Sequence, residues 1–408
     1  MERSTDRILT THVGSLPRPD YLLELDQRKR RGEAYDEAEH ADRLRRAVAE
    51  IVRRQVELGV DVVNDGEYGK SPRAKVDYGP WMFYVYERLT GWEPYEPGTP
   101  EPEQREEEPL VARRPERRDW TTFADFYQEE VLPALRPPSH PSAAPTYMRL
   151  WFTGPVSYVG EGSARRDVED LRAALSGVDV REAFMTAVAP ESFARGRNRY
   201  YRRESDFLYA LADAMRTEYR AIVDAGFVLQ IDDPGLAENW DQIDDSVSVE
   251  EYRRFAETTV EVLNHALSDV PEDRVRYHIC WGSWHGPHTT DLPLADVVDI
   301  MLKVRAQAYV VEAGNARHEH EWRVWQDTKL PDGKILMPGV VSHATNVVEH
   351  PQVVADRIIR YANVVGRENV VASTDCGLGG RIHPSLAWAK LGALAEGAAL
   401  ATKELWGR

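Results

Sequence analysis

The residue types best suited to chemistry are a histidine, two cysteines and a glutamate in the last third of the chain. His278 and Cys280 flank one residue in the run HIC, and in a strand two such side chains point to the same side. Glu312 ends the apolar run YVVE, and Cys376 lies in the run STDCGLG. One nitrogen, two sulfur and one oxygen donor suit tetrahedral Zn²⁺. These side chains are therefore predicted zinc ligands, with a core histidine beside an inert buried cysteine as the alternative.

The carboxylate of Glu312 decides what such a site would do. An unpaired carboxylate is costly to bury in an apolar strand, so it needs a metal ion or an ion pair, for example with Arg317. Four protein ligands normally close a structural zinc site, but a carboxylate is the ligand most easily displaced. An organic thiol could replace it and lose its proton, and the thiolate is the nucleophilic form. The pattern predicts that the site activates substrate sulfur as a zinc thiolate.

The elements that would position these residues alternate between strands and helices. Six segments have helical periodicity, at residues 43–59, 205–226, 249–267, 294–304, 351–365 and 384–405. Eight segments are predicted strands, at residues 9–15, 60–67, 148–155, 227–234, 275–282, 306–314, 335–341 and 369–377. This alternation predicts an α/β fold of the (β/α)8 TIM-barrel type. An open doubly wound sheet is the main alternative, but no glycine-rich nucleotide loop follows the first strand.

Chemically active side chains gather at or just beyond the carboxyl ends of the predicted strands. This is the end at which barrels build their active sites. A purely structural protein would have no reason to place them there. They are Ser15, Asp65, Glu67, Thr153, Asp232, Asp233, His278, Cys280, Glu312 and Cys376.

One domain is predicted over residues 1–408, interrupted by an insertion between strands 2 and 3 at about residues 80–145. Within it, residues 95–118 are rich in Pro, Glu and Arg and cannot bury much apolar surface. Residues 159–201 mix short helical runs with Pro and Gly and are expected to cover the mouth of the barrel.

Composition excludes several other classes of protein. The formal net charge of −17 argues against a nucleic-acid partner, because phosphates require a basic surface. Two cysteines are too few for a disulfide scaffold. No apolar run reaches the roughly eighteen residues of a membrane helix, and the charged start MERSTDR lacks the apolar stretch of a signal peptide. A cytoplasmic protein with no membrane partner is expected.

The motifs around these residues resemble those of the cobalamin-independent methionine synthase superfamily, in order along nearly the whole chain. The resemblance is to its single-domain members, which correspond to the catalytic C-terminal half. It implies one Zn²⁺ as cofactor. The motifs are THVGSLPRP, VVNDGE, FTGPV, LQIDDPGL, HICWGS, PGVVSHATNV and STDCGLG, and the ligands implied are His278, Cys280, Glu312 and Cys376.

The resemblance also implies roles for residues around the metal. Gly14 and Ser15 match the loop that holds the carboxylate of the thiol substrate, and Asp232 matches the carboxylate that holds its amino group. His343 matches a histidine proposed to assist proton transfer. His343 and Asp232 are therefore the predicted catalytic residues, and Gly14, Ser15 and Asp232 are predicted to bind substrate.

Glu67 is a further predicted substrate-binding residue. It shares a strand face with Asp65, and the two could form an acid–base pair. Alternatively, the two carboxylates anchor Lys70 and Arg73 through salt bridges.

Two departures from the family pattern bear on the substrate. Glu161 falls where methionine synthase has a tryptophan that stacks on folate, and Gly69 falls where it has a second substrate-binding glutamate. The opening TTHVGSLPRP and the run DGEYGKS look closer to a divergent branch that includes epoxyalkane:coenzyme M transferase.

The combined prediction is a zinc-dependent, methionine-synthase-like transferase that moves an alkyl group, first of all methyl, to an organic thiol. Its partners would be a small-molecule thiol and an alkyl donor, and a homo-oligomer is left open. The alternatives are epoxide opening or a C–S lyase reaction, and a non-catalytic binding barrel held together by zinc. Roles for four other histidines stay open, and the run RHEHEW lacks the spacing of a metal helix. These are His285, His288, His318 and His320.

Overall fold

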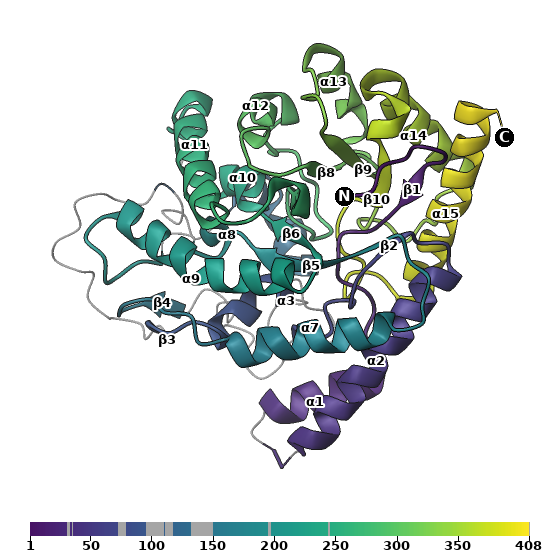
Figure 1. Cartoon of the computed structure of the whole chain (residues 1–408). Coiled ribbons are helices and arrows are strands. Elements are labelled where there is room, and N and C mark those ends of the chain that lie inside the picture. Colours follow the sequence, from purple (N-terminus) through teal and green to yellow (C-terminus); the bar gives the residue numbers. More distant parts are fainter. Residues whose placement is uncertain are drawn as a thin grey trace.

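Parallel strands form the centre of the molecule (Figure 1). The computed structural model describes residues 1–30, 33–34, 36–71, 79–94, 110, 117–131, 150–194, 197–243 and 245–407. Eight strands make one sheet in the order β1, β10, β9, β8, β7, β6, β5, β2. Their bounds are β1 (Leu9–Thr10), β2 (Val62–Val63), β5 (Glu182–Val188), β6 (Val228–Asp232), β7 (Val275–His278), β8 (Ala308–Glu312), β9 (Ile335–Val341) and β10 (Val371–Thr374).

Hydrogen bonds next to the two outermost strands bring the ends of the sheet together. The backbone amide of Asp61 donates to the carbonyl of Thr10 over 3.1 Å. The Thr11 hydroxyl donates to the carbonyl of Val62, also over 3.1 Å. The sheet therefore curls into a nearly closed barrel, and the predicted (β/α)8 class is confirmed.

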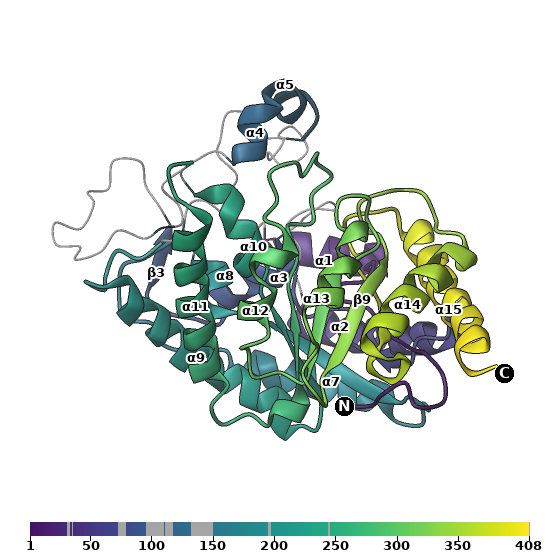
Figure 2. The same ribbon diagram turned by 90° about the horizontal axis from the view of Figure 1, so that it is seen from above.

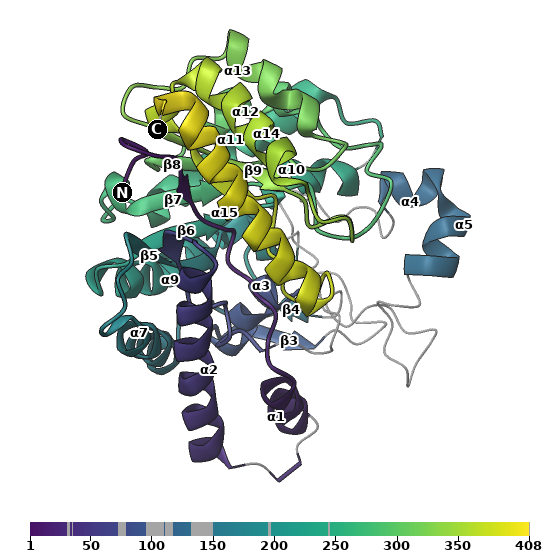
Figure 3. The same ribbon diagram turned by 90° about the vertical axis from the view of Figure 1, so that its right-hand side faces the viewer.

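Helices cover the outside of the barrel, and α14 and α15 pack side by side (Figure 3). Both begin with a proline at the first position, where the missing N–H needs no partner. The six predicted helical segments all correspond to helical residues, although 294–304 is split. The helices on the barrel are α1 (Asp20–Arg30), α2 (Glu37–Glu57), α7 (Glu161–Leu175), α9 (Glu204–Asp224), α11 (Val249–Ala266), α12 (Val298–Met301), α14 (Pro351–Val365) and α15 (Pro384–Trp406), with short helices α3 (Pro80–Phe83), α8 (Pro190–Ala194), α10 (Gly235–Glu238) and α13 (Val324–Asp327).

The third strand of the barrel is not the predicted one. The segment 148–155 does contain a strand, β4 (Leu150–Phe152), but it pairs antiparallel with β3 (Trp92–Pro94) in a separate small sheet. The barrel instead uses β5, which lies in the segment predicted to be an irregular cover. All but the first residue of β5 are buried, so it lacks the alternation that marks a half-exposed strand.

This correction changes which side chains lie at the mouth. Thr153 follows β4 and is exposed, away from the barrel sheet. Thr186, near the carboxyl end of β5, is buried and belongs to the barrel. The prediction of Thr153 as a mouth residue is therefore wrong, and Thr186 supplies the polar group of the third strand.

A buried arginine fills part of the barrel interior below the mouth. Arg276 on β7 donates to the Thr11 hydroxyl over 2.9 Å and to the His12 carbonyl over 2.6 Å. Its guanidinium lies 3.9 Å from the centre of the Phe184 ring. Burial, the largest effect, lowers the pKa of Arg276 to about 9 despite the nearby Asp232.

Part of the insertion is described and stands at one end of the molecule. It holds α4 (Arg118–Thr122), α5 (Ala124–Phe126) and the single π-turn Tyr127–Val131, and Figure 2 shows α4 and α5 beyond the helices of the barrel. The Pro/Glu/Arg-rich residues 95–109 and 111–116 lie outside the described residues. None of the described helices is long and apolar enough to cross a membrane.

Candidate active site

Three of the predicted zinc ligands lie together at the mouth. His278 ends β7, Cys280 follows it, and Cys376 comes two residues after β10. One ligand atom of each lies within 4.8 Å of the others, and all three side chains are buried. We call His278, Cys280 and Cys376 the thiol triplet.

The two sulfur atoms of the thiol triplet interact directly. The Cys280 thiol forms a hydrogen bond with Cys376, and that bond is the largest effect lowering the pKa of the Cys376 thiol. The nearby Arg381 and His278 lower it further, against the opposing effect of burial. The lowered pKa of Cys376 favours its thiolate, which is the form that binds metals.

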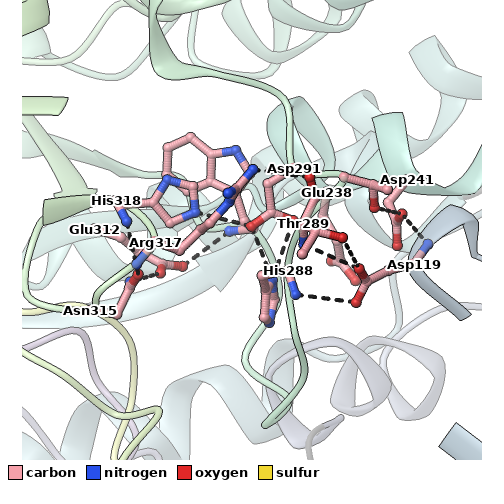
Figure 4. Close-up of polar contacts among 12 residues, drawn as sticks. Asp119, Glu238, Asp241, His288, Thr289, Asp291, Glu312, Asn315, Arg317 and His318 are labelled. Atoms are coloured by element: carbon pink, nitrogen blue, oxygen red, sulfur yellow. Dashed lines mark hydrogen bonds and ion pairs between the residues drawn. The ribbon is translucent and has the colours of Figure 1, made fainter. Parts of the chain in front are cut away.

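Glu312, the fourth predicted ligand, belongs to a neighbouring group. It ends β8, and one of its oxygens lies within 4.8 Å of ligand atoms of His343 and Asp375, all buried. Oε1 accepts from the Trp281 amide over 3.0 Å, and Oε2 accepts from Asn315 Nδ2 over 2.6 Å (Figure 4). Burial and the neighbouring Asp375 and Cys376 charges raise the pKa of Glu312 well above its usual range.

The sequence alternative of an ion pair between Glu312 and Arg317 is not found among the described residues. Arg317 is exposed and donates to the carbonyl of Thr289 over 3.0 Å. Glu312 is therefore held by a backbone amide and a side-chain amide, and the charge of His318 opposes the rise in its pKa.

Asp375 connects the loops that carry the two groups, a role that the sequence did not single out. Its Oδ1 accepts from the amides of Ala313 and Gly314 over 2.8 and 2.7 Å. Its Oδ2 accepts from Asn315 Nδ2 over 3.1 Å. Asp375 thus fixes the end of β8 beside Cys376, and its place in the run TDCG is the only sequence signal for it.

The donors of the thiol triplet fit a zinc ion. The buried Nδ1 of His278 has no hydrogen-bond partner among the described residues, although buried polar atoms normally have one. An imidazole nitrogen and two thiols are preferred zinc ligands, and a carboxylate within reach completes the usual four. Buried Glu312 and Asp375 add carboxylates next to this group.

His343 is buried just beyond β9, and neither of its ring nitrogens has a partner among the described residues. Burial is the largest effect on it and lowers the pKa of His343 to about 3. The imidazole is therefore neutral near pH 7, with one N–H and one free lone pair for a molecule at the mouth.

Buried carboxylates gather in another part of the mouth, next to β2, β5 and β6. Glu67 Oε1 accepts from the Thr186 hydroxyl over 2.7 Å, and Glu67 has a φ of 59°, which a residue other than glycine rarely adopts. Gly14 has a φ of 130°, and a Cβ there would lie 2.6 Å from Glu67 Oε1. Glycine is therefore required at position 14, because the backbone approaches the glutamate directly.

Lys70 supplies a cation to these carboxylates. It donates to the Thr186 hydroxyl, lies 3.6 Å from Glu67 Oε1, and packs 4.5 Å from the centre of the Tyr84 ring. Of the two predicted roles, the salt-bridge anchor is the one this geometry favours; Arg73 lies outside the described residues. We call Asp65, Glu67, Lys70, Thr186 and Asp232 the acidic cluster.

Asp232 lies at the end of β6, in register with His278 of β7. Gln230 donates to its Oδ1 and to the carbonyl of Val13, both over 2.6 Å. Burial and the nearby Glu67 charge raise the pKa of Asp232 to about 7, although His278, Lys70 and Gln230 oppose the shift. Gln230 thus orients this predicted catalytic carboxylate.

Ser15 joins the first strand to the loop after Cys376. Its carbonyl accepts from the amides of Leu378 and Gly379 over 2.8 and 3.0 Å. A Cβ on Gly377 would lie 2.9 Å from the Cβ of Ser15. The predicted substrate-binding serine therefore lies beside the residue that follows a predicted metal ligand.

Asp119 in α4 fastens the insertion to the loop after Cys280 (Figure 4). Its Oδ2 accepts from the Tyr127 hydroxyl over 2.6 Å and from the His288 amide over 3.1 Å. Its Oδ1 accepts from the amide and hydroxyl of Thr289 over 3.1 and 2.9 Å. His288 has a φ of 53°, so this contact holds a strained turn. We call these Asp119 bonds the insertion clasp.

The run RHEHEW forms no second metal group among the described residues. His318 lies between two carboxylates, with Nδ1 2.9 Å from Glu321 Oε2 and Nε2 3.1 Å from Asp291 Oδ2. It stacks on the Trp281 ring at 4.0 Å between centres. Its two carboxylate hydrogen bonds outweigh burial and raise the pKa of His318 to about 10, so the ring is a cation rather than a ligand.

The remaining histidines lie at the edge of the mouth. His320 is exposed. Nε2 of exposed His285 lies 3.2 Å from the carbonyl of His343. His288 lies with Nε2 3.1 Å from the Trp284 carbonyl. Of these three, His285 is the one in direct contact with a predicted catalytic residue.

The two departures from the family pattern have clear structural settings. Glu161 is the first residue of α7 and is exposed. A Cβ on Gly69 would lie 2.6 Å from Asp167 Oδ1, so a larger residue there would displace Asp167 from its ion pair with Arg88.

Parallel strands ringed by helices, with the polar site at their carboxyl ends, place the protein among TIM-barrel proteins of the catalytic type. The chain also matches the family model described as cobalamin-independent synthase, catalytic domain, over residues 8–78 and 185–399. It therefore belongs to this family, as the resemblance of its motifs predicted, and the membership supports an enzyme with a methyl-transfer function.

Individual relatives agree with the family match over the full length of the chain. Methionine synthases of Saccharolobus islandicus and Saccharolobus solfataricus are 23% and 24% identical, and each alignment covers 97% of this chain and 95% of the relative. A B12-independent methionine synthase from Shewanella sp. W3-18-1, solved with selenomethionine, has a TM-score of 0.66 at 18% identity. That comparison covers 98% of this chain and 100% of the other.

Proposed function

We propose that the protein is a zinc-dependent transferase that activates an organic thiol and alkylates its sulfur, with methyl transfer as the first candidate reaction. The observation that carries the proposal is the thiol triplet, in which buried nitrogen and sulfur donors converge and His278 Nδ1 has no described protein partner. The substrates would be a small-molecule thiol and an alkyl donor.

His278, Cys280 and Cys376 would hold the zinc ion, with Glu312 as the ligand that a substrate thiol replaces. A bound Zn²⁺ would lower the pKa of a thiol that reaches it, which favours the nucleophilic thiolate. Before substrate arrives, the Trp281 amide and Asn315 orient Glu312. These donors keep the carboxylate in place before a thiol replaces it.

The other residues of the mouth would bind and orient the substrates. The Gly14–Ser15 turn and Asp232 would hold the polar end of the thiol, with Glu67 behind Gly14. During transfer the sulfur forms a bond to the alkyl carbon while the bond from that carbon to the donor breaks. The leaving atom of the donor then takes a proton, and His343 could relay it from solvent, because a neutral ring accepts a proton at one nitrogen as it gives one from the other.

A cobalt-substituted protein tests the central claim. Co²⁺ in the site, titrated with homocysteine and other thiols, should develop new sulfur-to-metal charge-transfer bands as substrate sulfur binds. If no thiol changes the spectrum while chelation lowers the melting temperature, the metal is structural and the protein is a binding barrel.

A second candidate is the opening of an epoxide by the same thiol, or the reverse C–S lyase reaction. It is favoured by the exposed Glu161 at the start of α7, which falls where methionine synthase has the tryptophan that stacks on folate. Assays with methyltetrahydrofolate and with a short epoxide, each with the thiol panel, separate the two. Loss of methyl from the folate supports the first, and epoxide-dependent consumption of thiol supports the second.

A further inference from the structure

The ring of His343 has no hydrogen-bond partner that would fix its orientation. Its side chain is buried, and neither ring nitrogen has a partner among the described residues. In many enzymes a carboxylate or a carbonyl on one nitrogen orients the catalytic histidine. A ring that accepts a proton at one nitrogen as it gives one from the other needs both nitrogens for the reaction. The orientation of His343 therefore has to come from its packing and from the backbone that carries it.

A buried ion pair holds this stretch of backbone. His343 is the second residue after β9, and the loop that it begins leads to Glu349. Glu349 Oε1 accepts from the backbone amide of Ser342 over 2.8 Å. Glu349 Oε2 accepts from the ammonium of Lys390 in α15, also over 2.8 Å. Lys390 donates in addition to the carbonyl of Val347 over 2.5 Å. We call these three hydrogen bonds the loop clamp.

The loop clamp is buried, although the loop that it closes reaches the surface. The side chains of Lys390 and Glu349 are 0% and 8% exposed, whereas Val347 is 68% exposed. A buried ion pair is weak evidence for stability, because apolar residues of similar size often stabilise a protein equally well. Apolar residues could not accept the Ser342 amide or bind the Val347 carbonyl. The pair therefore does something that packing alone would not, which is to fix the backbone at both ends of the loop.

The peptide group that follows His343 is held from two other directions. Nε2 of His285, in the loop after Cys280, lies 3.2 Å from the His343 carbonyl. The amide of Ala344 donates to the Ser342 hydroxyl over 3.0 Å. The backbone is thus bonded on both sides of His343, while the ring nitrogens are left without a partner among the described residues.

We propose that Glu349 and Lys390 are positioning residues for proton transfer, and that the loop clamp sets the angle at which the His343 ring faces the alkyl donor. This inference rests on the proposed function, because it assumes that His343 relays the proton. A displacement of about 1 Å can lower a rate by about 100-fold, so a group that touches no substrate can still control the reaction. None of the hydrogen bonds of the loop clamp reaches the thiol triplet, so zinc and thiol should bind without it.

Two double variants separate the charges of the pair from its hold on the Ser342 amide. Glu349→Gln/Lys390→Met removes both charges but keeps a side-chain oxygen that can accept from this amide. Glu349→Leu/Lys390→Met removes the acceptor as well, and neither variant leaves a buried charge unpaired. With the alkyl donor that the wild type consumes, we expect kcat to fall by about 10- to 100-fold in the Leu variant. The Gln variant should keep most of the wild-type kcat. Zinc content by mass spectrometry and thiol affinity by cobalt titration should be unchanged in both.

The same exchange in a His343→Asn protein tests whether the loop clamp acts through His343. Residues that act as a unit have non-additive effects, so Glu349→Leu/Lys390→Met should lower kcat no further once His343 is absent. Hydrogen exchange of the Ser342 peptide in the zinc-free protein reports on the clamp without any activity. Protection should be lost in the Leu variant and kept in the Gln variant. The matched control is Glu257→Leu/Lys303→Met, in which the exposed pair is lost and kcat should not change.

An equal loss of kcat with and without His343 would overturn the inference, because the pair would then act on the fold as a whole. An unchanged kcat in the Leu variant overturns it as well. If that variant does not fold, Glu349→Asp replaces it: the charge stays, the side chain is one methylene shorter, and kcat should fall only while His343 is present. Full activity of His343→Asn alone, or no alkylation of any thiol by the wild type, overturns the proposed function and this inference with it.

Discussion

The thiol triplet and the acidic cluster share one barrel mouth and adjoin where Asp232 of β6 is in register with His278 of β7, yet they satisfy their buried polar groups differently. In the thiol triplet, His278 Nδ1 has no partner among the described residues, and neighbouring His343 has none on either nitrogen. In the acidic cluster, Thr186 bonds to Glu67 and Lys70 bonds to Thr186. The acidic cluster contains the ammonium of Lys70, whereas the charge of Arg381 lies near the thiol triplet without forming an ion pair among the described residues.

This difference helps to distinguish residues that bind a ligand from residues that hold other side chains in position. A buried donor without a partner is unfavourable unless something outside the chain satisfies it, so the thiol triplet indicates a bound ion. In the acidic cluster, Lys70 offsets part of the buried negative charge, although Glu67 Oε2 has no partner among the described residues. Both sides nevertheless contain a strained backbone, at His288 and at Glu67 respectively, as functional loops often do.

Removing an unpartnered ligand should have the largest effect. His278→Asn is expected to lower zinc affinity by more than about 100-fold, beyond what changes to residues behind metal ligands cause. Zinc bound per chain after dialysis measures this. His265→Asn is the matched control, because His265 is 40% exposed and pairs with Asp213. Full zinc retention in His278→Asn would contradict the role of His278 as a zinc ligand.

His343 lies beside the thiol triplet and has no partner on either ring nitrogen among the described residues, so it could act in proton transfer or as a metal ligand. His343→Asn should lower kcat by about 10²- to 10⁴-fold, the usual contribution of a general acid or base, while zinc content stays constant. Loss of zinc from this variant would instead place His343 among the ligands.

Lys70→Met should destabilise the acidic cluster. It leaves Glu67 buried without its cation, and such a loss destabilises proteins by about 3–5 kcal/mol. Urea unfolding measures the change. The matched variant Lys303→Met removes an exposed ion pair with Glu257 and should cost less than about 1 kcal/mol. Equal effects in the two variants would contradict a resident cation on the acidic cluster.

His318 provides a smaller effect that depends on pH. Its pKa is about 10 in the folded protein and roughly 6.5 in an unfolded chain. Between these two pH values the folded protein therefore holds a proton that the unfolded chain has lost. Stability should therefore fall as pH rises from about 7 to 10, by an amount on the order of a few kcal/mol. In His318→Gln this fall should be reduced, as urea unfolding at both pH values would reveal; an identical slope would contradict it.

Local sequence predicted which segments form helices and strands better than it predicted which strands pair with one another. The segment 351–365 coincides with α14 because a proline starts the helix and Gly366 follows it. The segment 148–155 was a correct strand in the wrong sheet, since no local pattern says which neighbour a strand joins. The convergence of Cys376 with His278 followed from barrel geometry. The hydrogen bonds from the Trp281 amide and Asn315 to Glu312 could not be predicted from the sequence. These contacts depend on three loops folding together.

The insertion clasp would couple the insertion to a metal ion bound at the thiol triplet. Among the described residues, Asp119 accepts hydrogen bonds from Tyr127 within the insertion and from groups in the stretch that begins eight residues after Cys280. An ion that immobilises Cys280 therefore also steadies the turn to which the insertion is fastened. Protection of the insertion from proteases should then rise with zinc loading, so that a cut far along the chain reports on the occupancy of the barrel mouth.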